Sequence, residues 1–212
     1  MKVSILTSAF PNGFTDDFIQ CVKEHYVNTG SFVLIASDFT VHSKTDKHTN
    51  TFLKRFKDNG IIFNDTHIID DRITKEMAME YTKEADVIWI SGGDTLKQIK
   101  YLKEYNLIPI LQKKEGLTIG MSAGSINMAK RVVLPSTLND NIPKLEIYEG
   151  IGLVDINIYP HLDSISDAGI KAIYEASRFT TIYGLYDNSF IKIIDGKMNI
   201  YGTHFKYKKS IC

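Results

Sequence analysis

Short apolar runs alternate with longer amphipathic segments along the first 130 residues of the chain. Four runs are rich in Val, Ile and Leu, as is typical of strands buried on both faces of a sheet: 2–8, 31–37, 86–91 and 117–121. Between them, apolar residues recur at helical spacing in four segments: 16–28, 43–59, 73–84 and 95–104. This alternation predicts an α/β fold with a doubly wound, mostly parallel sheet.

Several of the predicted helices carry end signals. Ser43 and Asp94 stand at the starts of two helical segments, where a side-chain oxygen can accept a hydrogen bond from a free backbone N–H. Gly30 and Gly60 lie just past the C-terminal ends of the segments 16–28 and 43–59, where a residue with positive φ is common. We therefore expect the first pair to act as N-caps and the second pair to end helices.

The pattern changes after about residue 130, where strand-like runs predominate. These runs cover 131–135, 154–160, 180–187, 189–195 and 197–207. One long helical segment, 164–179, lies among them, and Asp195-Gly196 is typical of a two-residue hairpin turn. The sheet is therefore predicted to end in antiparallel edge strands toward the C-terminus. Because the chain has no repeat and no linker-like tract, we expect one domain over residues 1–212.

The composition is that of an ordinary globular protein. Of the 212 residues, 43% are hydrophobic, and 25 Lys and Arg balance 25 Asp and Glu. Zero net charge leaves no basic excess to attract phosphate backbones or anionic lipid, so neither nucleic acid nor a membrane is an expected partner. Cys21 and Cys212 show no metal-ligand spacing, and no metal or other cofactor is expected. The apolar start of the chain is too short for a membrane span or a signal peptide, which favours a cytoplasmic location.

The most specific motif for catalysis is Gly-Met-Ser-Ala-Gly at residues 120–124. It follows a predicted strand and precedes a helix, which is the setting of a nucleophile elbow that holds a serine hydroxyl clear of the backbone. Ser122 is therefore a candidate nucleophile, and the amide of Ala123 is a candidate oxyanion donor. The alternative is that Ser122 merely caps the helix.

A second glycine-rich turn, SGGDT at residues 91–95, also follows a predicted strand. Ligands of open α/β sheets collect at the carboxyl ends of strands, so this turn is expected near Ser122. The amides of Gly92 and Gly93 are candidate oxyanion donors. A tight turn without a ligand, or a phosphate-binding turn, remains an alternative at this stage.

A serine nucleophile needs a base, and a histidine base needs an acid to orient it. His161 lies on a loop directly after a strand-like run and is the preferred base; the other histidines fit surface or packing positions better: His25, His42, His48, His67 and His204. Asp187 and Asp140 are the leading candidates for the acid, with Asp163 a third. Sequence spacing alone does not choose among them.

Five ordered motifs together resemble the peptidase E group of serine peptidases, family S51, which contains aspartyl dipeptidase and cyanophycinase. They are SGGDT, GMSAGS, NDNIP, INIYPHLD and GLYDNS, and they span about residues 86–195. The resemblance implies a fold like that of class I glutamine amidotransferases, with Ser122 as nucleophile, His161 as base and Asp187 as the third member. Asp140 corresponds to an acidic residue of less certain role in this family.

Two departures from the family pattern bear on activity. Asp94 stands where the family often has Asn, and we expect its carboxylate to turn away from the oxyanion and cap its helix. Asp187 is one methylene shorter than the family's usual Glu, so His161 or the backbone must come closer to it.

The resemblance implies a serine peptidase acting on small peptides, with dipeptides that begin with Asp as the implied substrate. Such a substrate calls for a cationic pocket, for which Arg131 and Arg178 are candidates by residue type only, since each fits a surface position better. Two other functions remain open, namely an amidase with the same triad and a catalytically silent binding protein. The sequence leaves the oligomeric state open.

Overall fold

A computed structural model of the protein describes residues 1–26, 29–136, 142 and 144–208. Its main sheet has seven strands in the order β11-β10-β1-β5-β4-β2-β3. The five parallel strands are β1 (Lys2–Thr7), β2 (Ser31–Ile35), β3 (Asp65–Ile69), β4 (Val87–Ile90) and β5 (Gly116–Met121). Beyond β1, the sheet continues with β10 (Phe190–Ile194), which is antiparallel to β1, and ends with β11 (Lys197–Tyr201), which is antiparallel to β10. This confirms the predicted α/β fold with antiparallel edge strands.

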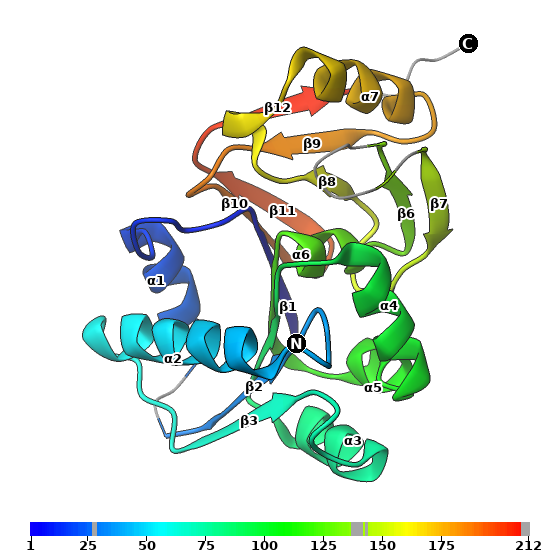
Figure 1. Cartoon of the computed structure of the whole chain (residues 1–212). Coiled ribbons are helices and arrows are strands. Elements are labelled where there is room, and N and C mark those ends of the chain that lie inside the picture. Colours follow the sequence, from blue (N-terminus) through cyan, green and yellow to red (C-terminus); the bar gives the residue numbers. More distant parts are fainter. Residues whose placement is uncertain (27–28, 137–141, 143, 209–212) are drawn as a thin grey trace.

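Helices cover both faces of this sheet (Figure 1). One face packs against α1 (Asp16–Lys23) and α2 (His42–Asp58), and the other against α3 (Lys75–Glu84), α4 (Thr95–Glu104), α5 (Ile108–Lys113) and α6 (Ala123–Asn127). The α1–α2 side is rich in aromatic rings, among which Trp89 of β4 is fully buried. Apolar residues on both sides of each central strand explain the uninterrupted apolar runs in the sequence.

A smaller layer lies beyond the β10–β11 edge, at the top of Figure 1. Its three-stranded sheet has the order β12-β9-β8, built from β8 (Asn157–Tyr159), β9 (Ile182–Leu185) and β12 (His204–Tyr207). Helix α7 (Asp167–Ser177) packs on it through buried residues such as Ile173, and the 3-10 turn η1 (Leu162–Ser164) precedes α7. A separate hairpin joins β6 (Arg131–Leu134) to β7 (Glu146–Glu149). The late strand-like runs therefore divide among three sheets.

The register of the parallel strands brings their carboxyl ends to one edge. Thr7 of β1 pairs with Met121 of β5, and Ile90 of β4 pairs with Gly120. The residues that follow these three strands are therefore neighbours, as expected for ligand sites in sheets of this kind. The Asp195-Gly196 turn joins β10 to β11 and confirms the predicted hairpin.

Several local predictions were wrong. The N-cap of α2 is Val41, whose side chain makes no capping bond, so Ser43 is not the cap; Asp94, in contrast, caps α4 as predicted. Helix α1 ends at Lys23, so Gly30 does not terminate it. Gly30 instead directly precedes β2 and lies against the side chain of Asp86. Gly60 does follow α2 with φ +77°. Strands β3 and β7 and helix α5 were not predicted.

Among the described residues, no helix combines the length and the apolar character that a membrane crossing requires.

The close approach of α6 to β4 makes a specific demand on Gly124. A Cβ at this position would lie 2.7 Å from the carbonyl carbon of Ile90 and would clash with its oxygen. We expect Gly124→Ala to lower the free energy of unfolding by at least about 2 kcal/mol, which for a chain of this size lowers Tm by roughly 5 °C or more. Thermal unfolding by circular dichroism measures this.

Gly196→Asn is the matched control, because nothing lies within 4 Å of the Cβ position of Gly196 and Asn tolerates positive φ. A Gly124→Ala variant as stable as this control would show that α6 is not held tightly against β4.

Candidate active site

Ser122 occupies a strained turn between β5 and α6. Its φ of 49° and ψ of −110° are unusual for a residue with a side chain, and its hydroxyl makes no capping bond to the helix. The backbone N–H of Ser122 donates to Thr7 O at 2.9 Å, and Ser125 Oγ bonds both the N–H and the C=O of Thr7 at 2.8 and 2.9 Å. These bonds fix the turn to β1 and leave the Ser122 hydroxyl available, which argues against the N-cap interpretation.

His161 lies on the loop between β8 and η1, also with positive φ (58°). Its Nε2 is 2.9 Å from Ser122 Oγ, and its Nδ1 is 2.9 Å from Asp187 Oδ1. With the proton on Nδ1, the imidazole donates to Asp187 and accepts from the Ser122 hydroxyl. The side chain is 41% exposed, so the base faces a region open to solvent.

Asp187 follows β9, and both its carboxylate and its backbone N–H form hydrogen bonds. Besides His161, its Oδ1 accepts a hydrogen bond from the hydroxyl of Ser8 at 2.7 Å. Its backbone N–H donates to Asp163 Oδ2 at 2.5 Å, so Asp163 contacts the loop of Asp187 rather than the imidazole. Asp140 lies outside the described residues. Of the two candidate acids that the structure describes, Asp187 and Asp163, it brings Asp187 to His161.

The SGGDT turn lies directly beside Ser122. A Cβ added to Gly92 would come within 3.2 Å of Ser122 Cβ, and Gly93 has φ +140°, where a side chain would clash with Ser37. Within the described chain, no backbone carbonyl accepts from the amide of Gly92, Gly93 or Ala123. These three amides are therefore free to act as donors to a ligand at this edge of the sheet.

Asp94 is turned into its own helix. Its Oδ1 accepts from the backbone N–H of Lys97 at 2.9 Å, which makes it the N-cap of α4. The negative charge thus interacts with the positive end of the helix dipole, where it is stabilised. This confirms the expected role of the residue.

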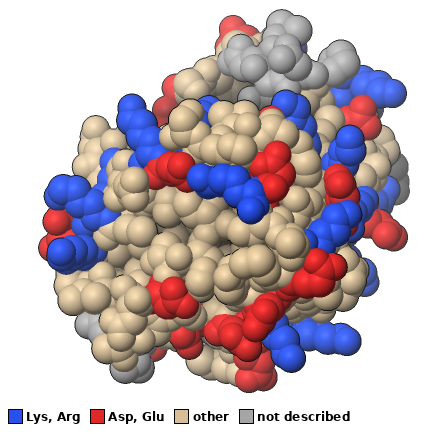
Figure 2. Space-filling view, turned by 60° about the horizontal axis from the view of Figure 1, so that its bottom comes forward, with Lys and Arg blue, Asp and Glu red and all other residues tan. Residues whose placement is uncertain are grey.

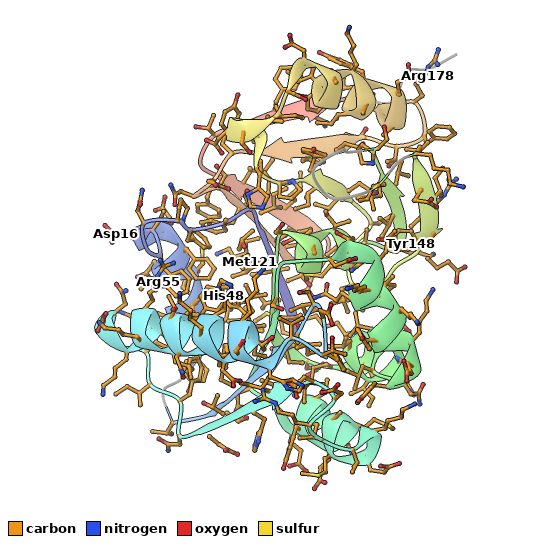
Figure 3. The ribbon with its side chains drawn as sticks, in the orientation of Figure 1. Asp16, His48, Arg55, Met121, Tyr148 and Arg178 are labelled. Atoms are coloured by element: carbon orange, nitrogen blue, oxygen red, sulfur yellow. The ribbon has the colours of Figure 1, made fainter. Side chains whose placement is uncertain are left out.

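A buried polar network fixes the SGGDT turn against the end of α6. Gln98 Nε2 donates to Ser91 O at 2.8 Å, and Asn127 Nδ2 donates to Thr95 O at 2.9 Å and to Gln98 Oε1 at 3.1 Å. From β7, the Tyr148 hydroxyl donates to Asn127 Oδ1 at 2.9 Å, and its burial raises the pKa of Tyr148. Figure 3 shows Tyr148 pointing from β7 toward α6 and α4. This network could not be predicted from the sequence, because it joins distant polar residues through contacts within the core.

Within the described residues, no histidine other than His161 is hydrogen-bonded to Ser122. His67 binds Asp65 and stacks on Tyr81, and His204 Nδ1 lies 3.3 Å from Gly202 O, which accepts when that nitrogen carries the proton. His25 differs from the expectation of a surface residue, since it follows α1 and its side chain is only 11% exposed.

One group of described side chains has the geometry of a metal site: His42, Asp70 and Asp71 place ligand atoms within 4.8 Å of one another. However, Arg72 binds both carboxylate oxygens of Asp70, at 3.0 and 2.6 Å, and His42 bonds to Asp71. Asp70 and Asp71 follow β3, three strands away from β5, and His42 begins α2, so the group is separate from Ser122.

The two arginines considered for a cationic pocket lie on β6 and at the end of α7. Arg131 is exposed at the start of β6. Figure 3 shows Arg178 at the outer end of α7, far from Met121, which precedes Ser122. Figure 2 shows acidic and basic side chains interspersed over the face that it presents.

Ser8 is the site residue that the sequence reading missed most plainly. It directly follows β1, the strand between β5 and β10, so the rule that places ligand sites at carboxyl ends of strands applied to it as well. Its small polar side chain in an apolar run carried no motif of its own. Asp163 was considered, but its contact with the backbone of Asp187 had no sequence signal.

Two solved structures resemble this chain in fold. The chain is similar in structure to a crystal structure assigned to peptidase E from Listeria monocytogenes EGD-e, with a TM-score of 0.71 and 19% identity, covering 95% of this chain and 98% of the other. It is also similar to the crystal structure of a peptidase from an acI-B1 Actinobacterium, with a TM-score of 0.70 and 15% identity, covering 100% and 96%. These likenesses concern the fold.

A comparison with curated proteins gave no match. The sequence model of peptidase family S51, in contrast, matches residues 13–201, which is most of the chain and includes Ser122, His161 and Asp187. The protein therefore belongs to peptidase family S51.

Proposed function

We propose that the protein is a serine peptidase that hydrolyses small peptides through an acyl-enzyme. The observation that carries this proposal is the chain of contacts from Ser122 Oγ to His161 Nε2 and from His161 Nδ1 to Asp187 Oδ1, each 2.9 Å long. A hydroxyl at hydrogen-bond distance from an imidazole that a carboxylate orients is the arrangement that acyl transfer to serine requires. Membership of family S51 supports the same activity.

In the proposed reaction, Ser122 Oγ forms a bond to the scissile carbonyl carbon while its proton passes to His161 Nε2. When the C–N bond breaks, His161 delivers that proton to the leaving amine, and Ser122 remains acylated. Water then attacks the ester and gives a proton to His161, which returns it to Ser122 Oγ as the acid product leaves. Asp187 keeps the imidazole in the productive tautomer and stabilises the imidazolium.

The tetrahedral intermediates carry a negative oxygen that needs donors. We assign this role to the amides of Gly93 and Ala123, with Gly92 adjacent to them. Two features support the assignment: these amides have no backbone acceptor in the described chain, and Ala123 directly follows the nucleophile at a helix start. The buried network of Gln98 and Asn127 would hold the SGGDT turn, which contains Gly92 and Gly93, in place.

Dipeptides with an N-terminal Asp are the proposed substrates, on the strength of the family resemblance. The test is a panel of dipeptides in which the N-terminal residue is Asp, Asn, Glu, Lys or Ala, together with simple amides that lack an α-amino group. Free amine release is measured for each compound. Cleavage of Asp-X dipeptides at the highest kcat/KM is the expected result.

The same panel separates the two alternatives. Turnover of simple amides without cleavage of any dipeptide would identify an amidase with this triad. If no compound turns over and active-site reagents leave Ser122 unmodified, the protein is a binding protein on a peptidase scaffold, and the proposed function fails.

A further inference from the structure

The hydroxyl of Ser8 lies between the base and the acid of the proposed triad. Its Oγ is 2.8 Å from the backbone N of His161 and 2.7 Å from Asp187 Oδ1. The residue is fully buried, with 0% of its surface exposed, so water does not compete for these bonds.

The direction of each bond follows from the donor inventory. A serine hydroxyl has one hydrogen to donate, and the backbone N–H of His161 can only donate. Ser8 Oγ therefore accepts from His161 and gives its single hydrogen to the Asp187 carboxylate. Asp187 Oδ1 then receives two donors, Ser8 Oγ and His161 Nδ1.

Ser8 is itself fixed by the backbone around it. Its N–H donates to Ser189 O at 3.1 Å, and the N–H of Asn188 donates to Ala9 O at 2.7 Å, so the end of β1 is tied to the loop after Asp187. The preceding residue, Thr7, accepts from the N–H of Ser122 at 2.9 Å. Thr7, the last residue of β1, thus holds the nucleophile turn, and Ser8, which follows it, contacts the base and the acid.

We propose that Ser8 is a positioning residue, whose buried hydroxyl sets the Asp187 carboxylate against the His161 imidazole. This inference rests on the proposed function. Asp187 has a short side chain. Its Oδ1 reaches His161 Nδ1, and the Ser8 hydroxyl donates to the same oxygen and fixes its position. Charge-assisted hydrogen bonds of this kind are short and directional, so loss of one frees the carboxylate to rotate.

The test uses a fluorophosphonate probe, because it reports acylation chemistry without a known substrate. Ser8→Ala is expected to lower the inactivation rate at saturating probe, kinact, about 10- to 100-fold. The half-saturating probe concentration should change less than threefold, because Ser8 is buried and does not touch the ligand.

Ser189→Ala is the matched control. Ser189 is equally buried, two residues from Asp187, and its Oγ donates to Thr203 O at 2.8 Å rather than to the triad. Ser8→Ala loses the two hydrogen bonds of its buried hydroxyl and Ser189→Ala loses one, so both variants should have a lower Tm than wild type, but only Ser8→Ala should lower kinact. Equal kinact values for Ser8→Ala and wild type would overturn the inference.

A double-mutant cycle separates positioning from general damage. In an Asp187→Ala background the hydroxyl of Ser8 has no carboxylate to hold, so adding Ser8→Ala should lower kinact less than threefold. A loss as large as in the wild-type background would show that Ser8 acts on structure generally, and would overturn the proposal. Should Ser8→Ala not fold, Ser8→Cys, with its weaker donor, takes its place with the same expectations.

The outcomes also distinguish this inference from the proposed function. Failure of the wild-type protein to label at Ser122 would refute the serine peptidase. Normal labelling of wild type with unchanged kinact in Ser8→Ala would refute only the role of Ser8.

Discussion

Replacement of His161 with alanine is expected to lower kcat on the best peptide of the panel by about 10⁴-fold. The hydroxyl of Ser122 would then have no group to accept its proton, since His161 Nε2, the proposed base, lies 2.9 Å from it. The measurement is steady-state release of free amine at saturating substrate, with circular dichroism to show that the fold is retained.

His204→Ala is the control for this change. His204 lies in β12, is exposed, and bonds only locally at Gly202 O, so its removal should leave kcat within about twofold of wild type. A His161→Ala enzyme that retains a tenth or more of wild-type kcat would show that another group serves as the base.

The second large effect is expected for Asp187→Asn, which should lower kcat by a similar factor, about 10⁴. An amide at this position can donate to His161 Nδ1 and thereby favour the tautomer with its proton on Nε2, where it cannot accept from Ser122 Oγ. The change preserves side-chain volume, so Tm should fall little compared with the loss in rate.

Asp167→Asn makes the same chemical change on an exposed residue at the start of α7 and should leave kcat unaffected. Asp140→Asn is the decisive comparison, because the sequence left Asp140 open as the acid. A large loss in Asp140→Asn with little change in Asp187→Asn would assign the third triad role to Asp140.

Much of the central sheet could be predicted because its strands obey a simple rule. A strand buried on both faces must be apolar at successive positions, and β1, β2, β4 and β5 show this pattern plainly. Strand β3 lies at the edge, where its first four residues are not fully buried, so only Ile68 and Ile69 carried an apolar signal. Its omission follows from its position.

The elements after residue 130 illustrate a different limit. The strand character of β6 and of β8 to β12 was predicted and that of β7 was not. The sequence also did not show that β8, β9 and β12 form a sheet separate from β10 and β11. The choice of partner strand depends on contacts over long sequence separations, such as those of Ile173 and Tyr207 in the small core under α7. Local periodicity carries no information about such contacts.

At the candidate site, sequence motifs identified the candidate nucleophile and base but not the residues that position them. Ser122 and His161 lie at the ends of strands, in recognisable settings, and were singled out for that reason. The choice of Asp187 over Asp140 depended on family resemblance, since an acid works wherever the fold brings it to the imidazole. Ser8 and Asn127 had no motif, because their roles come from the groups that surround them in space.

The most direct test of the central claim is fluorophosphonate labelling of the folded protein, with the modified residue identified by peptide mass spectrometry. The account predicts one adduct per chain on Ser122, its absence in Ser122→Ala and in heat-denatured protein, and slow formation in His161→Ala. Folded wild-type protein that stays unmodified, or an adduct that persists in Ser122→Ala, would contradict it.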